Sequence, residues 1–203
     1  APWLNPFDEH MTFDAPFYGS VKESKVKMMS RKAYMNYAEY MGCQLVELPY
    51  EGGRYTMYVL LPPKDLDMNE VIGYLSEDAY KTALASLQPT EVQLRMPKVK
   101  AESSLLLNDS LQKMGIRTAF SAAADFSGIA EMGPLVLDQV RQKCYVEISE
   151  KGTEAAAVTS AQIRLTSARP SSYEKMTVDR PFVFFIADTQ KDNIMFAGRI
   201  MNL

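Results

Sequence analysis

The most informative stretch of this chain is EKGTEAAAVTSAQIRLTSARPSS, residues 150–172, a long run of small and mostly uncharged residues close to the end of the sequence. Successive residues of a β-strand point to opposite faces, and every second residue here belongs to an uncharged row: Thr153, Ala155, Ala157, Thr159, Ala161 and Ile163. The other row carries Glu154 and Arg164 and could face water. No proline lies between Pro134 and Pro170, so a complete ladder of backbone hydrogen bonds can form. The segment can therefore be a strand, although its ends resemble a loop.

Length and composition indicate one globular domain, or one domain and part of another. The chain has 203 residues, of which 47% are hydrophobic and 23% are charged, which is enough to bury a core. Its 25 acidic and 22 basic residues give a net charge of -3 without a block of one sign, so we expect neither nucleic acid nor an anionic membrane as a partner. The longest apolar runs are far shorter than the roughly 20 residues that a membrane-spanning helix needs. No signal peptide is visible, so that of an exported protein would lie upstream.

Hydrophobic alternation and turn residues predict a mixed fold with more strand than helix. Strands are expected at residues 25–40, 43–50, 54–63, 91–103, 134–149, 177–189 and 194–203. Helices are expected at residues 69–75, 77–87 and 103–115, the last with Leu107, Leu111 and Met114 on one face. The order of these elements, with no internal repeat and no linker, predicts an antiparallel-rich α+β fold in one packed unit or part of one.

Asp67 or Asn69 can cap the first helix, Ser76 can cap the second, and Pro89 would end the second. The strand at 54–63 is largely apolar on both faces, which is typical of a central strand covered on both sides.

The sequence lacks the side-chain sets that most enzymes require. His10 is the only histidine, so a serine or cysteine triad has at most that one base, and we expect His10 to be an exposed loop residue. No zinc, calcium or phosphate-binding motif occurs, and we expect no cofactor. Cys43 and Cys144 are expected to be buried thiols, with a single disulfide as the alternative. We therefore predict that the chain is not an enzyme.

Several motifs resemble those of the serpins, the serine-protease-inhibitor family, in the same order along essentially the whole chain. TVDRPFVFFIA is similar to the family's C-terminal signature, EKGTEAAAVTSA to the hinge of its reactive-centre loop, and IMFAGRIMNL to its last strand. The other matching stretches are Trp3 to Phe7 with Thr12 and Phe17 beyond it, KMMSRKAYMNYAE, GCQLVELPY, MYVLLPP, MPKVKAES, LQKMGIRTAFS and ADFSGI. A serpin domain is longer than this chain, so the resemblance implies that residues 1–203 are a partial serpin domain. Its N-terminal helices and part of its central sheet would be absent.

The resemblance implies a suicide-substrate inhibitor of serine proteases, with cysteine proteases as a further option. In an inhibitory serpin the reactive-centre loop, here residues 150–172, is exposed until a protease attacks it. The loop then inserts into the central sheet as a strand and traps the acyl-enzyme. The implied hinge residues are Glu150, Gly152, Thr153, Glu154, Ala155, Ala156 and Ala157.

The cleaved bond follows from spacing within the family pattern. Sixteen residues on from Glu150, the pattern places the cut between Thr166 and Ser167, which suits an elastase-like or subtilisin-like protease. Arg164–Leu165 is the alternative, which trypsin-like proteases would prefer.

The resemblance also assigns residues at the base of the loop. Glu150 is expected to pair with Lys98, and Trp3 is expected to lie at the top of the sheet where insertion begins. The ordinary alternatives are a surface ion pair of little consequence and a tryptophan that only packs. The implied partners are the target protease and the missing N-terminal part, and the implied location is extracellular or at the cell surface.

Two other functions stay open. A serpin-fold protein that acts as a chaperone or carrier would be expected to carry proline, bulk or charge on the inward row of its hinge, and none occurs here. A fragment that acts by associating with a complementary chain is the second alternative, because a partial domain exposes strand edges and apolar faces.

Overall fold

The computed structural model describes residues 1–129, 135–153 and 172–203. They form two compact units, one made of Ala1–Val99 with Glu147–Leu203 and the other of Lys100–Val146. The strands are β1 (Phe13–Tyr18), β2 (Glu23–Tyr40), β3 (Cys43–Pro49), β4 (Tyr55–Leu61), β5 (Gln88–Pro97), β6 (Val99–Leu106), β7 (Arg141–Ser149), β8 (Gly152–Thr153), β9 (Glu174–Thr177), β10 (Phe182–Asp188) and β11 (Asn193–Ile200). The α-helices are α1 (Met68–Tyr74), α2 (Glu77–Ala85) and α3 (Asn108–Lys113), and single 3-10 turns lie at Glu9–Met11 and Thr118–Phe120.

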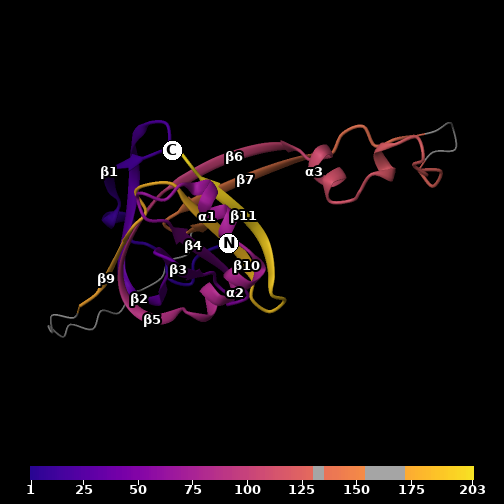
Figure 1. The fold of residues 1–203 in the computed structure, drawn as a ribbon. Helices are drawn as coiled ribbons and strands as arrows, with labels where there is room; N and C mark the ends of the chain where they lie inside the picture. The colour runs from indigo at the N-terminus through magenta and orange to yellow at the C-terminus, as the bar shows by residue number, and fades with distance from the viewer. Residues whose placement is uncertain (130–134, 154–171) are drawn as a thin grey trace. The chain divides into compact units, whose positions relative to one another are not determined.

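A sheet of eight strands forms most of the first unit. Its order is β11-β10-β4-β3-β2-β5-β9, and β1 pairs with the first part of β2 (Figure 1). The pairings are antiparallel except that of β5 with β9. A second sheet contains β6, β7 and β8. The predicted α+β class, with mostly antiparallel strands, is thus confirmed.

Strand β4 is central and covered on both faces, as its composition predicted. Every residue from Thr56 to Leu61 is buried. Tyr58 and Leu60 pack in the cluster that includes residues of α1 and α2, and the neighbouring Leu61 points to the opposite face and is fully buried. The core of this unit therefore lies on both sides of the sheet at β4.

The first two helices begin where their capping residues predicted. The Asp67 side chain accepts a hydrogen bond from the Asn69 amide at 2.7 Å, and Ser76 Oγ accepts one from the Ala79 amide at 3.1 Å. The predicted end of the second helix at Pro89 is wrong. Helix α2 ends at Ala85, and Pro89 lies inside β5, where it is opposite Asn36 of β2.

The predicted bounds of three elements in the 91–149 region are also wrong. The strand expected at 91–103 is divided at Lys98 into β5 and β6, and the helix expected at 103–115 is only Asn108–Lys113, because residues up to Leu106 belong to β6. Sheet pairing overrides local helix propensity there. Met114 is 79% exposed, so it does not lie on a buried helical face. The strand expected at 134–149 begins at Arg141, and residue 134 lies outside the described part.

The cysteines and the histidine have no catalytic environment. Cys43 and Cys144 are both free, so the disulfide alternative is wrong, and only Cys43 is buried. Burial raises the pKa of the Cys43 thiol, which makes it less reactive. His10 lies exposed in a 3-10 turn, as predicted. Among the described residues, no helix is both long and apolar enough to cross a membrane.

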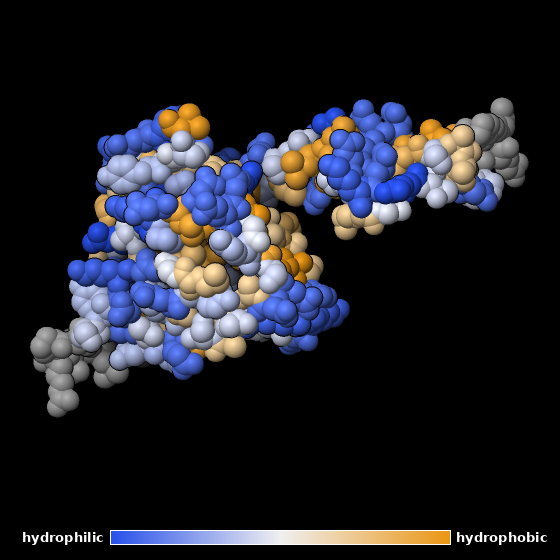
Figure 2. All heavy atoms as spheres, viewed as in Figure 1, coloured by the Kyte–Doolittle hydropathy of each residue, from blue (hydrophilic) through white to orange (hydrophobic). Residues whose placement is uncertain are grey.

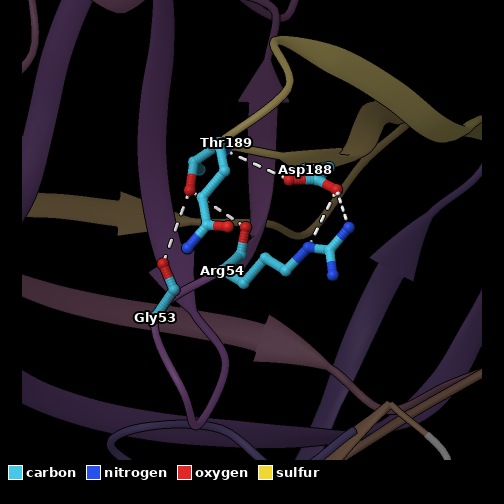
Figure 3. Close-up of polar contacts among 5 residues, drawn as sticks. Gly53, Arg54, Asp188 and Thr189 are labelled. Carbon is cyan, nitrogen blue, oxygen red and sulfur yellow. Dashed lines mark hydrogen bonds and ion pairs between the residues drawn. The ribbon is translucent and has the colours of Figure 1, made fainter.

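The hairpin between β3 and β4 is tied to the end of β10 (Figure 3). Gly53 has a φ of +66°, which favours glycine in this turn. Arg54 donates from Nε and Nη2 to Asp188 Oδ2 at 3.0 and 2.7 Å, and the hydroxyl of Thr189 donates to the Arg54 carbonyl at 2.9 Å. The hydrogen bonds from Arg54 hold the pKa of Asp188 below its ordinary value. These contacts fix the order of β3, β4 and β10.

Strand β11 forms one edge of the large sheet and exposes apolar side chains. Ile194, Met195 and Phe196 are each about half exposed. In the view of Figure 2, hydrophobic residues gather along the strip of the body where Figure 1 places β11. An apolar edge strand of this kind is suited to being covered by further protein.

The coverage of β4 on both faces gives a direct prediction. Leu60→Ala and Leu61→Ala should each lower the free energy of unfolding by about 2–5 kcal/mol, since each removes a buried side chain from a different face. Urea unfolding of the full-length protein measures both, with Leu4→Ala as the control because Leu4 is half exposed. A large loss at only one of the two positions would show that β4 is covered on one side.

Candidate functional site

The first residues of the predicted loop already form a strand between two others. On one side β8 pairs with the end of β7, where Thr153 lies opposite Ile148. On the other side the Thr153 amide donates to the Ala1 carbonyl at 3.0 Å, the Ala1 nitrogen donates to the Thr153 carbonyl, and Pro2 forms an antiparallel bridge with Gly152. The base of the loop therefore occupies a position inside a sheet.

An aromatic pair contacts the side chain of Thr153. The Thr153 hydroxyl lies 2.7 Å from the hydroxyl of Tyr50. The Tyr50 ring stacks on Trp3 with ring centres 4.6 Å apart, and Trp3 Nε1 donates to the Ser149 carbonyl at 2.9 Å. Both aromatic side chains are buried, and burial raises the pKa of Tyr50 to about 12, so its hydroxyl stays protonated near neutral pH. Thr153 thus faces the buried Tyr50 side chain, which carries no charge near neutral pH.

Glu150 is held by three partners at the turn before β8. Its Oε2 accepts from Lys98 Nζ at 2.8 Å, its Oε1 accepts from the Thr12 hydroxyl at 2.9 Å, and its carbonyl accepts from the Phe7 amide at 2.9 Å. The carboxylate is almost fully buried. Burial raises the pKa of Glu150, but the hydrogen bonds from Lys98 and Thr12 outweigh it and keep the pKa below the ordinary value. Glu150 is therefore ionised at neutral pH.

A buried arginine supports the segment that contacts Glu150. Arg31 of β2 donates from Nη1 to the Asn5 carbonyl, and its guanidinium lies 5.1 Å from the centre of the Phe7 ring. Burial lowers the pKa of Arg31 to about 10, which still leaves it charged at neutral pH. Arg31 thus contacts Asn5 and Phe7, and the amide of Phe7 binds the Glu150 carbonyl.

Only glycine fits at position 152. Gly152 has a φ of +151°, and a Cβ atom there would lie 2.2 Å from the Ala1 carbonyl oxygen and 2.7 Å from the Pro2 Cα. The backbone of residues 1–2 can approach β8 this closely because residue 152 has no side chain.

Comparison with known proteins identifies the family. The model of the serpin family, described as serpin (serine protease inhibitor), matches residues 1–203. The chain belongs to the serpin family. It is 36% identical over 204 residues to Iripin-8 of Ixodes ricinus, covering 98% of this chain and 51% of that protein. It is 33% identical over 208 residues to leukocyte elastase inhibitor A of Rattus norvegicus, covering 98% and 54%.

Solved serpin structures share the fold. Thyroxine-binding globulin in complex with thyroxine superposes with a TM-score of 0.85 at 30% identity, over 100% of this chain and 53% of that one. The chain spans about half the length of the curated relatives it matches. This agrees with the prediction of a partial serpin domain. The inhibitor names of the relatives also agree with the prediction that the chain is not an enzyme.

The structure brings together the part of the predicted serpin site that it describes. Glu150, Gly152, Thr153, Lys98 and Trp3 all lie around the turn between β7 and β8. The other predicted hinge and cleavage residues lie outside the described residues: Glu154, Ala155, Ala156, Ala157, Arg164, Leu165, Thr166 and Ser167.

Sequence reasoning gave no role to two residues of this site, Thr12 and Tyr50. Thr12 lies in a stretch that resembles the family, but its hydroxyl reaches Glu150 across 138 positions of sequence. Tyr50 follows a predicted strand, and only the bridge between Trp3 and Tyr50 places it beside Thr153. No local pattern predicts either contact.

The buried carboxylate of Glu150 leads to a stability prediction. Glu150→Gln should lower the free energy of unfolding by about 1–2 kcal/mol at pH 7, because two charge-assisted hydrogen bonds are weakened. The loss is no larger because Lys98 is half exposed and water screens its charge. Glu9→Gln is the matched control, since Glu9 pairs with the adjacent Lys151 at the surface and should cost little.

The same pair predicts a pH dependence. A carboxylate whose pKa is lowered on folding stabilises the protein above the ordinary pKa, about 4.3, and loses this effect as the pH falls through the lowered value. Denaturation of the full-length protein and of Glu150→Gln should therefore differ at pH 7 and converge at strongly acidic pH. A constant difference over the whole range would contradict the role of the ionised carboxylate.

Gly152→Ala should loosen the base of the loop, because its methyl group cannot fit against the Ala1 carbonyl. Hydrogen exchange of the full-length protein should be faster at the Thr153 amide, which donates to that carbonyl. Gly73→Ala is the control, since nothing lies within 4 Å of a Cβ atom at Gly73. Unchanged exchange at Thr153 would show that the sheet accommodates the methyl group.

Proposed function

We propose that this chain is the C-terminal part of an inhibitory serpin that traps proteases by inserting residues 150–172 into its central sheet. The observation that carries the proposal is β8, where Gly152 and Thr153 pair with β7 on one side and with residues 1–2 on the other. A strand that continues from β8 would extend an existing sheet. This pairing supports a path of insertion that begins at β8.

The reaction belongs to the protease, and the inhibitor supplies the bait and the motion. The protease serine attacks the carbonyl carbon of Thr166, the peptide bond to Ser167 breaks, and an ester to the protease forms. Insertion of the freed loop then moves the attached protease away from its docking position. This movement distorts the protease's oxyanion hole before water can hydrolyse the ester. Each inserted residue adds about 3.3 Å to the strand.

The composition of the loop supports insertion through Thr153. The Thr153 side chain points to Tyr50, whose ring stacks on Trp3, so alternate residues that continue this strand would point to the same buried side. These residues, from Ala155 to Ile163, are uncharged. Backbone hydrogen bonds and burial of this row would provide the free energy for translocation.

We assign the cleaved bond to Thr166–Ser167 and keep Arg164–Leu165 as the alternative. Threonine suits elastase-like and subtilisin-like proteases, and one relative is named a leukocyte elastase inhibitor. Arginine would instead attract trypsin-like proteases. The mass of the C-terminal peptide released from the complex distinguishes the two, because it begins at Ser167 or at Leu165.

An extracellular location, a carrier function and association with the missing part of the domain are the further proposals. Serpins include extracellular and intracellular members, so family membership does not favour the extracellular location that the resemblance implied. A carrier role is that of thyroxine-binding globulin, which has the same fold. The apolar edge at Ile194, Met195 and Phe196 suits docking of the missing N-terminal part.

Thr153→Arg should convert the inhibitor into a substrate. A guanidinium at this position would have to be buried against Tyr50 and Trp3 during insertion, at a cost of several kcal/mol. The full-length variant, incubated with pancreatic elastase, subtilisin and trypsin, should be cleaved without forming a denaturant-resistant complex.

Glu154→Arg is the matched control, since it places the same side chain on the row that faces water. The control should still form the covalent complex. Complex formation by Thr153→Arg would show that the loop does not insert through this hinge. Cleavage without a complex in the unmodified protein would favour the carrier function.

A further inference from the structure

We infer that the outer face of the sheet formed by β2, β5 and β9 is a second contact surface for the target protease, and that it binds acidic residues near the protease's active cleft. This inference rests on the proposed function and adds to it a determinant of protease choice outside the loop.

Strand register places three cations on this face. Lys32 of β2 lies opposite Gln93 of β5, which lies opposite Lys175 of β9, so the two lysines flank one glutamine in a single row. Arg95 occupies the next row on the same face. The alternate residues Val92, Leu94 and Met176 are buried and point to the core. The three cations therefore share the outer face.

Aromatic rings hold these cations in place. The Lys32 ammonium lies 3.9 Å from the centre of the Tyr173 ring, and the Lys175 ammonium lies 5.8 Å from the same ring. Arg95 lies 5.5 Å from the centre of the Phe13 ring. Cation–π contacts of this kind leave the charge available to a second partner while they restrict the side chain. A partner therefore meets positioned cations, which lowers the entropy cost of binding them.

The charge of this face is positive although that of the chain is negative. On this face Glu91 of β5 lies 3.5 Å from Lys32 Nζ, and Glu47 of β3 lies farther along, bonded to Asn36 at 2.6 Å. Glu174 of β9 is exposed next to Lys175 but lies opposite Val92, in the alternate row. The rows that contain Lys32, Gln93, Lys175 and Arg95 thus hold three cations, with Glu91 as the carboxylate beside Lys32, in a chain with a net charge of -3. The exposed Tyr34, opposite Glu91, adds an aromatic side chain of the type enriched in protein interfaces. An acidic protein surface is complementary to this face.

The face also differs from the surface suited to the missing half. The exposed residues of β11 are Ile194, Met195 and Phe196, which are apolar and require cover. On the face of β2, β5 and β9, the corresponding positions hold lysine, arginine and glutamine, which are suited to water or to a polar partner. The missing part of the domain is therefore expected at β11, and the cationic face is left for a partner molecule.

Distance along the chain identifies that partner as the attacking protease. Tyr173 follows Ser167 by six residues, which span at most roughly 20 Å. A protease–inhibitor interface covers about 800 Å² on each partner, a patch roughly 30 Å wide. A protease centred on the Thr166–Ser167 bond is thus within reach of Tyr173, Lys175 and Lys32, on the side of its cleft that binds residues after the cut.

The test uses two proteases with the same chemistry and opposite net charge, anionic and cationic trypsin. In the full-length protein with Thr166→Arg combined with Arg164→Gln, which removes the competing arginine, both should attack the bond after residue 166. We expect Lys32→Ala combined with Lys175→Ala to lower the second-order rate constant for anionic trypsin about 10-fold at low salt, and less at high salt. The rate constant for cationic trypsin should not fall, and the number of inhibitor molecules used per protease trapped should not change.

Lys25→Ala combined with Lys27→Ala is the matched control. It removes the same charge from β2 at positions that point to the opposite face, where both lysines pair with Asp14. Equal rate losses in the two double variants would overturn the inference, because net charge alone would explain them, and so would an unchanged rate in the first variant. Tyr173→Leu, which keeps both lysines, should give an intermediate loss with anionic trypsin.

Failure of the proposed function gives a different result. If the protein with Thr166→Arg and Arg164→Gln is cleaved by both trypsins and forms a covalent complex with neither, the trapping mechanism is wrong and the inference fails with it. If complexes form at equal rates in all variants, trapping stands and only the contact surface is overturned. Thermal denaturation of each variant verifies that the substitutions leave the fold intact.

Discussion

The site depends on one buried, ionised carboxylate, that of Glu150, at the turn between β7 and β8. Glu150 satisfies its two oxygens with Lys98 and Thr12, and its carbonyl binds the Phe7 amide. These partners come from two separate regions of the chain, residues 7–12 and Lys98, so they meet Glu150 only after the first unit has folded. A buried charge needs such partners, because burying an unpaired carboxylate would lower the free energy of unfolding by several kcal/mol. The turn that starts the loop is therefore fixed by tertiary structure and not by local propensity.

The same turn is held by close packing at the two residues that follow it. Gly152 permits residues 1–2 to pack directly against β8, and Thr153 is matched to a wall of two buried rings. The buried carboxylate of Glu150 and the pairing of Gly152 and Thr153 thus hold the start of the loop at two adjacent places.

The sequence predicted most of the fold but only part of the site. The coverage of β4 and the caps at Asp67 and Ser76 follow from periodicity and from local hydrogen bonding, which act within a few residues. The limits of α3 and β6 do not, because residues up to Leu106 pair with a strand more than thirty positions away. Family resemblance pointed to Glu150, Lys98 and Trp3, whereas the contacts of Tyr50 and Thr12 depend on strand topology that no single segment encodes.

The stacking of Trp3 on Tyr50 has an optical consequence. Trp3 is the one tryptophan in these 203 residues, and its indole is buried, stacked on a phenol ring and bonded through Nε1 to the Ser149 carbonyl. Its emission spectrum therefore depends on the packing of the strand that carries the hinge. Any movement that separates β8 from the aromatic pair would change the wavelength and yield of that emission. The chain thus contains its own spectroscopic probe, located where the loop joins the sheet.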